Sequence, residues 1–450
     1  MAIFVRDKAF YKMVLALAVP IAMQNLITTG VSMMDTIMLG ALGEIQLSAA
    51  SLAGQVSFIF MIFNFGISGG AGVLTAQYWG KRDITAIKHI MATMYRVSLS
   101  VGAFAMLISL FFPAQIMSIF SREPEVVAEG IKYLQIMAFT YVMYGVTITT
   151  IGVLRTVGTV KISLIVYSLS FITNVFFNWV FIYGNLGAPR LEIRGAALGT
   201  LIARVTEFLV ITAFMRYKEK DLHFRWRDIL PTDAGRSAEF RRTAAPVAIN
   251  ELVWASGFSM LSVIMGQMGS MVVAANSICQ VMIQFVSVFF QGVGNASAVV
   301  IGNTIGQGRY KDAEDRAKTL LALSVILGLC ACGLLLLLKP IAINFYNVSE
   351  ATKQLASQIM TVASVVVIFS SIAMITVVGT LRGGGDVKFG LFIDVVFLWA
   401  VAIPLGFFTG LKLGLPAVIV YSCLRVDELL KSVFCFTRIL SQKWLRDLTK

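Results

Sequence analysis

Charged residues are scarce in this chain. They make up 14% of its 450 residues, whereas a soluble protein of this length carries about a quarter. Hydrophobic residues make up 58%, and the mean hydropathy is +0.82. Most of the chain therefore cannot face water, which excludes a soluble enzyme and an intrinsically disordered protein.

Cysteine and histidine are also sparse, with five and two residues. The cysteines lie within apolar stretches and lack metal-site spacing, so we interpret them as small buried hydrophobic residues. His89 and His223 lie in or beside expected cytoplasmic loops, and no HExxH, GxSxG or paired-aspartate motif is present. We therefore expect no catalytic residues and no cofactor, because an intramembrane enzyme needs a nucleophile–base pair or a metal site.

Long apolar runs dominate the chain instead. A window of about 19 residues identifies membrane-spanning candidates, and it predicts an all-α polytopic membrane protein with twelve transmembrane helices. The first run is too long for a signal peptide, so we expect it to stay in the membrane. The predicted segments are 11–39, 47–78, 90–112, 127–154, 162–183, 194–215, 239–266, 272–303, 318–339, 355–381, 387–409 and 414–437.

The placement of lysine and arginine predicts the orientation of these segments. With a cytoplasmic N-terminus, 26 of the 37 basic residues fall in inner segments and seven in outer ones. This asymmetry favours a prokaryotic inner (plasma) membrane location with both termini in the cytoplasm. It also accounts for the net charge of +13. We expect no nucleic-acid partner, because binding to nucleic acid requires a soluble domain with a basic surface.

The chain repeats itself. One proline and four glycines recur at an offset of 226, and a later Leu-Arg pair and a lysine recur at 227. We predict two six-helix lobes, 1–215 and 239–450, joined by a cytoplasmic basic linker, 216–238, and related by a pseudo-two-fold axis along the membrane normal. Two such lobes suit an alternating-access carrier, whereas a channel would show a filter-like loop. The clearest matches are Pro20/Pro246, Gly40/Gly266, Gly43/Gly269, Gly66/Gly292, Gly80/Gly306 and Lys161/Lys388.

Four polar residues in the first half are expected at similar depth. Asp35 lies near the outer end of the first helix, Asn174 and Asn178 share a face of the fifth, and Thr200 lies near the outer end of the sixth. One carboxylate with amide and hydroxyl oxygens is a ligand set for a small cation, and a carboxylate away from water also binds a proton. We predict a coupling site for Na⁺ or H⁺, with Asp35, Asn174 and Asn178 as the metal ligands if the ion is Na⁺. The alternative is interhelical hydrogen bonding alone.

The second half lacks this set. The residues equivalent to Asp35, Asn174 and Asn178 are Leu261, Val401 and Leu405, so we expect the coupling ion in the first lobe.

Substrate-contacting residues are predicted in both lobes. Glu251, expected near mid-depth of the seventh helix, is suited to attract a cationic substrate; the alternative is an ion pair or hydrogen bond with a neighbouring helix. Gln280 and Gln284 are weaker candidates for lining the central cleft. Met33 and Trp254 complete the predicted set. The many methionine and phenylalanine residues of the chain suit an adaptable apolar cavity.

Two arginine–glutamate pairs with three-residue spacing lie in the sixth and twelfth segments. We interpret both Arg204–Glu207 and Arg425–Glu428 as structural ion pairs. Asp394 has no partner that the sequence identifies.

The combination of segments resembles the multidrug and toxic compound extrusion (MATE) family over essentially the whole chain. The segments that carry the resemblance include AVPIAMQNLITTGVSMMDTIMLGALG (18–43), NVFFNWVFIYGNLGAP (174–189), RGAALGT (194–200), APVAINELVWASGFSMLSVIMGQMG (245–269) and GTLRGGGDVK (379–388).

The resemblance implies a secondary antiporter that exports drugs in exchange for Na⁺ or H⁺. It implies that Asp35 is the cation-coupling carboxylate of the first helix and that Asn174, Asn178 and Thr200 complete its site. This chain has Trp254 and Ser371 at two positions where some members of the family have acidic residues. We expect organic cations or neutral amphipathic molecules as substrates, the lipid bilayer as surroundings and a monomeric protein. The alternative is a lipid-linked oligosaccharide flippase of the same superfamily. Such a protein would need several cationic side chains in its cleft to bind a pyrophosphate.

Overall fold

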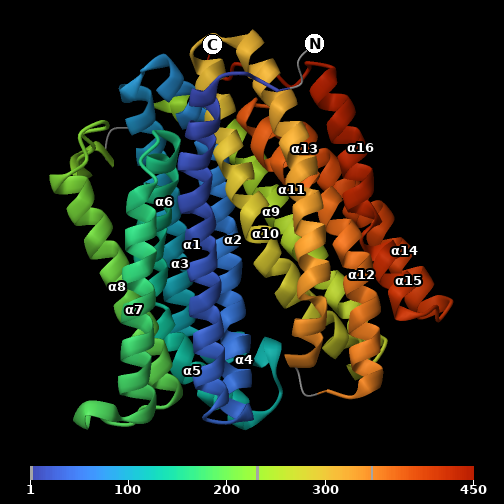
Figure 1. Ribbon diagram of the computed structural model, residues 1–450. Coiled ribbons are helices and arrows are strands. Elements are labelled where there is room, and N and C mark those ends of the chain that lie inside the picture. Colours follow the sequence, from blue (N-terminus) through green and yellow to red (C-terminus); the bar gives the residue numbers. More distant parts are fainter. Residues whose placement is uncertain (1–3, 230–232, 346–347, 450) are drawn as a thin grey trace. The chain divides into compact units, whose positions relative to one another are not determined.

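The computed structural model describes residues 4–229, 233–345 and 348–449. Within these ranges the chain is mainly helical and contains no β-strand (Figure 1). The α-helices are α1 (Lys8–Gly40), α2 (Glu44–Lys81), α3 (Ile84–Phe111), α4 (Pro113–Phe120), α5 (Pro124–Met137), α6 (Thr140–Thr156), α7 (Lys161–Tyr183), α8 (Ile193–Tyr217), α9 (Ala234–Gln267), α10 (Ser270–Gly306), α11 (Tyr310–Phe345), α12 (Glu350–Ala373), α13 (Val387–Val395), α14 (Ile403–Phe407), α15 (Ala417–Leu424) and α16 (Val426–Leu440).

The helices confirm the predicted multi-pass architecture. Among the described residues, ten helical segments are long and apolar enough to cross a membrane, and α5 with α6, bent by 50°, forms an eleventh. The pair α15 and α16 occupies the place of the twelfth predicted segment and is interrupted at Arg425. Helices suit a bilayer because it offers no water to satisfy backbone N–H and C=O groups.

Two of these segments contain wider, π-helical turns. Turn η3 (Met374–Leu381) continues α12, while η4 (Val396–Ala402) and η5 (Phe408–Lys412) flank α14. Each segment nevertheless remains one membrane-spanning element.

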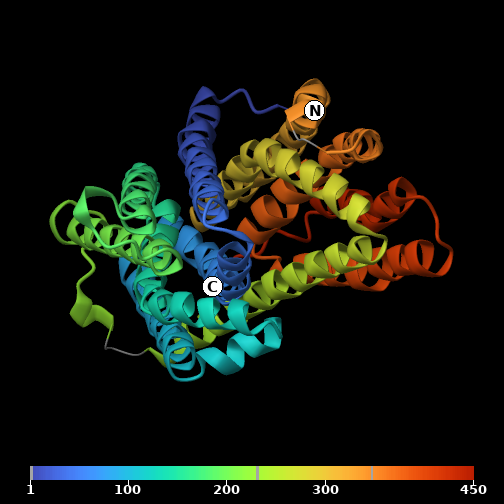
Figure 2. The ribbon, with the colours of Figure 1, turned by 90° about the horizontal axis from the view of Figure 1, so that it is seen from below.

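The chain forms two compact units. The first unit comprises residues 23–71 and 83–244, and the second comprises 1–22, 72–82 and 245–450. Within the first unit α7 and α8, green in Figures 1 and 2, lie side by side. Within the second unit α11 packs along α12. The lobe boundaries at 215 and 239 stay a prediction.

In the second unit α2 and α10 cross with their backbones in contact. A Cβ atom on Gly306 would lie 1.9 Å from the carbonyl oxygen of Gln77, and one on Gly80 would lie 2.9 Å from the Cα of Gly306. One turn away, a Cβ on Gly302 would lie 2.7 Å from the Cβ of Ala76. Small residues at four-residue spacing allow this approach. Both Gly80/Gly306 and Ala76/Gly302 are separated by the repeat offset of 226, so repeat-related residues meet here.

The residues after α16 pack onto the same unit. Trp444 is fully buried, and the side chain of Gln77 donates to the carbonyl of Arg446 at 3.0 Å. The Nζ of Lys81 lies 3.3 Å from the carboxylate of Asp447, which also accepts from the Tyr310 hydroxyl at 3.1 Å. The C-terminal segment therefore ties the end of α2 to the start of α11.

Candidate functional site

The four polar residues predicted to lie together do so, on three helices of the first unit. The Nδ2 of Asn178 on α7 donates to Asp35 on α1 at 2.6 Å and to the Oδ1 of Asn174 at 3.3 Å. The Nδ2 of Asn174 in turn donates to the hydroxyl of Thr200 on α8 at 3.3 Å. The result is one continuous chain of hydrogen bonds across α1, α7 and α8.

Asp35 carries the negative charge of this cluster. Its side chain is half-buried, and no Lys, Arg or His nitrogen of the described residues lies within 4.0 Å of its carboxylate. Asn174 and Asn178 are buried, and the Oδ1 of Asn178 has no hydrogen-bond partner within the described chain. The cluster therefore has a carboxylate and a spare amide oxygen, both suited to a positive charge.

Arg204, which lies four residues after Thr200 on α8, forms an ion pair with Glu207. Its guanidinium donates to both carboxylate oxygens of Glu207 at 2.8 Å and lies 4.8 Å from the ring centroid of Tyr144. The hydroxyl of Ser170 also donates to Glu207, at 2.5 Å. The predicted Arg204–Glu207 ion pair is confirmed, and its charges balance within the pair.

Two glycines on α8 bring this helix close enough to α7 to build the cluster. A Cβ on Gly195 would lie 2.5 Å from the carbonyl of Phe181, and one on Gly199 would lie 2.1 Å from the Oδ1 of Asn178. The spacing of four residues puts both glycines on the face of α8 that meets α7. The RGAALGT segment therefore sets the distance between Asn174 and Thr200.

The donor set does not suit a transition metal. No group of three His, Cys, Asp or Glu side chains that could hold such an ion occurs in the described part of the chain. One carboxylate with neutral oxygens suits Na⁺ or a proton. The predicted cation-binding role of Asp35, Asn174, Asn178 and Thr200 stays a prediction.

Glu251 on α9 forms a buried ion pair. Its Oε1 accepts from Arg382 at 2.8 Å, and the two side chains are 12% and 6% exposed. The sequence did not identify this partner because 131 positions separate the two residues. The contact with substrate predicted for Glu251 stays a prediction, and any such contact involves a carboxylate already balanced by Arg382.

The other predicted substrate residues lie in different surroundings. The ring of Trp254 stacks on that of Phe258, with centroids 5.6 Å apart, and Phe258 lines a pocket together with Gln280. Gln284 on α10 is exposed. Met33 is 52% exposed and belongs to the first unit.

The interpretation of Arg425 and Glu428 as an ion pair is wrong. The helix is interrupted at Arg425, which has φ −111° and ψ 7° and separates α15 from α16. Among the described residues Arg425 has no carboxylate oxygen within 4.0 Å. The three-residue spacing brings side chains together only in a continuous helix.

A buried ionic network on α9, α13 and α16 was not predicted. Asp394 accepts from the amide of Asn250 at 2.9 Å and pairs with Lys431 at 3.0 Å. Lys431 also pairs with Asp427 at 2.9 Å. Asp427 and Lys431 are four residues apart on one helix, and this spacing is the sequence pattern that could have predicted their ion pair.

Comparison with known proteins agrees with this architecture. The MatE family model matches residues 20–180 and 246–408. The chain is 27% identical over 449 residues to the probable multidrug resistance protein NorM of Agrobacterium fabrum, covering 94% of each chain. It is 24% identical to the multidrug resistance protein MdtK of Edwardsiella ictaluri, covering 88% of this chain and 87% of that one.

A solved structure shares the fold. The outward-facing conformation of a multidrug resistance MATE family transporter of the MOP superfamily matches with a TM-score of 0.87 and 18% identity, covering 96% of both chains. The two ranges matched by the family model lie one in each half of the repeat and together cover more than two thirds of the chain. The protein is therefore a multi-pass membrane protein that belongs to the MatE family.

Proposed function

We propose that this protein is a secondary antiporter. It exports small amphipathic organic molecules, cationic or neutral drugs among them, in exchange for Na⁺ or H⁺, by alternating access of a central cleft. The names of its relatives, probable multidrug resistance protein NorM and multidrug resistance protein MdtK, support export of drugs. Transport, and not catalysis, is the activity we infer.

The coupling residue is Asp35. The observation that carries this assignment is the 2.6 Å hydrogen bond from Asn178 to a half-buried carboxylate that has no cationic partner among the described residues. Na⁺ would bind to the oxygens of Asp35, Asn174 and Asn178, with Thr200 supporting Asn174. A proton would bind to the carboxylate oxygen that Asn178 does not engage.

The ion and the drug compete because they bind preferentially to different conformations of the transporter. Each stabilises a different state of the transporter, so binding of one favours release of the other without a shared site. We propose that Glu251, Gln280, Gln284, Met33 and Trp254 contact the substrate.

The protein acts as a monomer in a prokaryotic inner membrane, with both termini in the cytoplasm. The distribution of basic residues supports this orientation. In the second unit the amide of Val5 donates to Thr319 at 3.0 Å, and the hydroxyl of Tyr310 donates to Asp447. Val5 and Asp447 thus both contact the first three turns of α11, which supports placing both termini on one side of the membrane.

The test is transport of a fluorescent organic cation, such as ethidium, in vesicles that contain the purified protein. Sodium and pH gradients are imposed separately, and an ionophore that collapses each gradient is the control. We expect one of the two gradients to drive accumulation against the substrate gradient. Transport that is indifferent to both gradients would overturn the proposed function.

A further inference from the structure

The end of α2 packs with the second unit, although α2 belongs to the first half of the repeat. Residues 44–71 of this helix lie in the first unit, whereas residues 72–82 group with α10 and α11 in the second. An alternating-access transporter moves its two halves apart on one side of the membrane and then on the other. In the proposed cycle we therefore expect the end of α2 to separate from α10 when the cytoplasmic side opens.

Gln77 of α2 is bound by the C-terminal segment, the residues after α16. Its side chain is fully buried. The Nε2 donates to the carbonyl of Arg446 at 3.0 Å and to that of Gly383 at 3.4 Å, and the Oε1 accepts from the amide of Leu448 at 2.9 Å. A buried amide is costly without hydrogen bonds, so Gln77 needs this segment as long as it remains buried.

Lys81, one turn further along α2, makes a second contact of this kind. Its Nζ donates to the carbonyl of Thr449 at 3.0 Å and lies 3.3 Å from the carboxylate of Asp447. The same carboxylate accepts from the Tyr310 hydroxyl of α11 at 3.1 Å. Asp447 thus joins α2 to α11, and its two partners can be removed one at a time.

On the second half of the repeat, the C-terminal segment is attached by buried groups. Trp444 is fully buried, and a Cβ on Gly384 would lie 2.3 Å from its Cε3 atom. The amide of Arg446 donates to the carbonyl of Gly384 at 2.8 Å. Its guanidinium lies 3.2 Å from the buried carboxylate of Asp386, which also pairs with Arg438 at 2.6 Å. Glycine at position 384 leaves room for the indole ring, so the loop before α13 is shaped to hold the segment.

The two attachments differ in kind. On the second half, detachment would expose an indole ring to water, which is unfavourable for a large apolar surface. On α2 the segment holds only the polar side chains of Gln77 and Lys81. Water can replace hydrogen bonds of this kind at a small net cost once α2 moves away. The segment is therefore suited to remain on the second half and to release α2.

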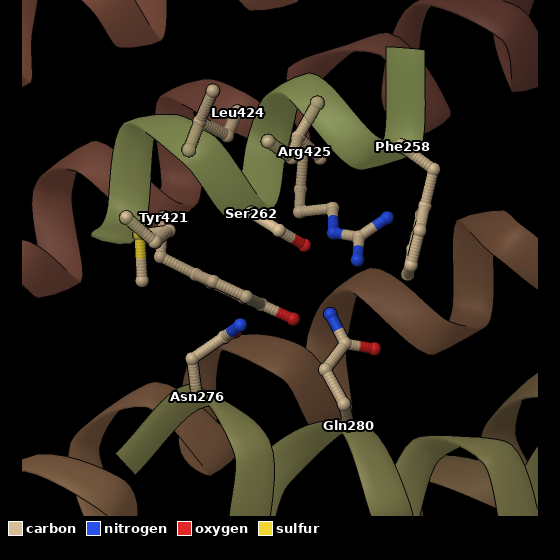
Figure 3. A pocket seen from close by; sticks show the side chains of 9 residues that line it. Phe258, Ser262, Asn276, Gln280, Tyr421, Leu424 and Arg425 are labelled. Atoms are coloured by element: carbon tan, nitrogen blue, oxygen red, sulfur yellow. The ribbon is translucent and has the colours of Figure 1, made fainter. Parts of the chain in front are cut away.

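We propose that the C-terminal segment is a latch, which keeps the end of α2 against α10 and releases Gln77 and Lys81 when the cytoplasmic side opens. This inference rests on the proposed function, because it assigns the latch to one step of the transport cycle. A variant that weakens the latch populates the open state more. None of the described side chains that line the pocket around Gln280 belongs to the latch contacts (Figure 3), so latch variants leave this predicted substrate residue in place.

The test measures the distance between the end of α2 and the start of α11 without any ion gradient. Spin labels are attached at two exposed positions through Arg82→Cys and Lys311→Cys, in a protein whose five native cysteines are replaced by serine or alanine. Double electron–electron resonance in lipid nanodiscs gives the populations of short and long distances. We expect Gln77→Ala to raise the ratio of long to short distances about tenfold, because it removes buried hydrogen bonds to the latch.

Two substitutions around Asp447 form a matched pair. Lys81→Gln removes its partner on α2, and Tyr310→Phe removes its partner on α11. Lys81→Gln should shift the distances in the same direction as Gln77→Ala, and by less, because the Lys81 side chain is 31% exposed. Tyr310→Phe should leave the distances unchanged. If Gln77→Ala does not fold, this pair decides.

Unchanged distances in a folded α2 variant, or an equal shift in Lys81→Gln and Tyr310→Phe, would overturn the latch. Gradient-driven transport by the wild-type protein together with such a result would leave the proposed function intact. Shifted distances in both α2 variants, in a protein without gradient-driven transport, would overturn the antiporter function and leave the latch standing.

Discussion

The amide of Asn178 donates to the carboxylate of Asp35 at 2.6 Å, although 143 positions separate the two residues. This bond joins α1 to α7, and it holds Asp35 in one position without neutralising it. The geometry around Asn178 consequently affects how Asp35 binds a cation.

Gly199→Ala tests this dependence without substituting either residue. The added Cβ would lie 2.1 Å from the Oδ1 of Asn178, so Asn178 or α8 must shift, and we expect the bond from Asn178 to Asp35 to lengthen. We expect the half-saturating concentration of the coupling ion to rise about tenfold, as for other residues that orient an ion ligand. The measurement is transport rate against ion concentration in vesicles.

Gly54→Ala is the matched control for this variant. Gly54 also lies in a helix of the first unit, and its Cβ would meet no atom within 4 Å. An unchanged ion dependence in Gly199→Ala, or an equal change in both variants, would contradict the role of Asn178.

Gly306→Ala should destabilise the second unit. The new Cβ would lie 1.9 Å from the carbonyl oxygen of Gln77, and a rigid backbone contact of this kind costs about 1–3 kcal/mol of unfolding free energy. Gly333→Ala, whose Cβ meets no atom within 4 Å, should be neutral or slightly stabilising. Thermal unfolding in detergent compares the two, and equal Tm values would rule out the close crossing of α2 and α10.

Glu251→Gln should lower stability, because it leaves Arg382 buried and unpaired. Removing one partner of a buried ion pair costs about 3–5 kcal/mol. The double variant Glu251→Gln/Arg382→Gln removes both charges and should recover most of the lost Tm. If the double variant also recovers transport of organic cations, the role of Glu251 is structural. If the double variant is stable but transports a different range of substrates, the result supports the predicted contact between Glu251 and substrate.

Asp447 should make the C-terminal segment sensitive to acid. Burial raises the pKa of its carboxyl, but hydrogen bonds from Thr449 and the ion pair with Lys81 outweigh this and hold the pKa below the usual 3.8. A carboxyl with a lowered pKa stabilises the folded state above its unfolded pKa, and this contribution is lost as the pH falls. Asp447→Asn should therefore lower the Tm at neutral pH.

The Tm difference from wild type should shrink as the pH falls below about 4. The control is Glu350→Gln, which removes an ion pair with Lys353 in which Glu350 is 81% exposed. The Tm of this variant should stay close to that of the wild type over the same pH range. A constant difference for Asp447→Asn from pH 7 to pH 3 would speak against the ion pair.

The sequence predicted the twelve-segment layout and the cluster at Asp35, because both depend on local patterns: apolar length, repeat offset and depth within a helix. It did not predict the partners of Glu251 and Asp394, since Arg382 and Lys431 lie on other helices, and spacing along the chain does not show which helices pack together. It was wrong about Arg425 and Glu428 because spacing rules assume a continuous helix, and the backbone is interrupted at Arg425.

Asp35→Asn tests the central claim most directly. The amide occupies nearly the same volume as the carboxylate and retains hydrogen-bonding capacity toward Asn178, but it cannot bind a proton and holds Na⁺ weakly. Vesicles with the wild-type protein or the variant are loaded with a fluorescent organic cation, and its movement is followed under imposed sodium and pH gradients. We predict folded protein, retained substrate binding and loss of gradient-driven transport; gradient-driven transport at the wild-type rate in Asp35→Asn would contradict coupling at this residue.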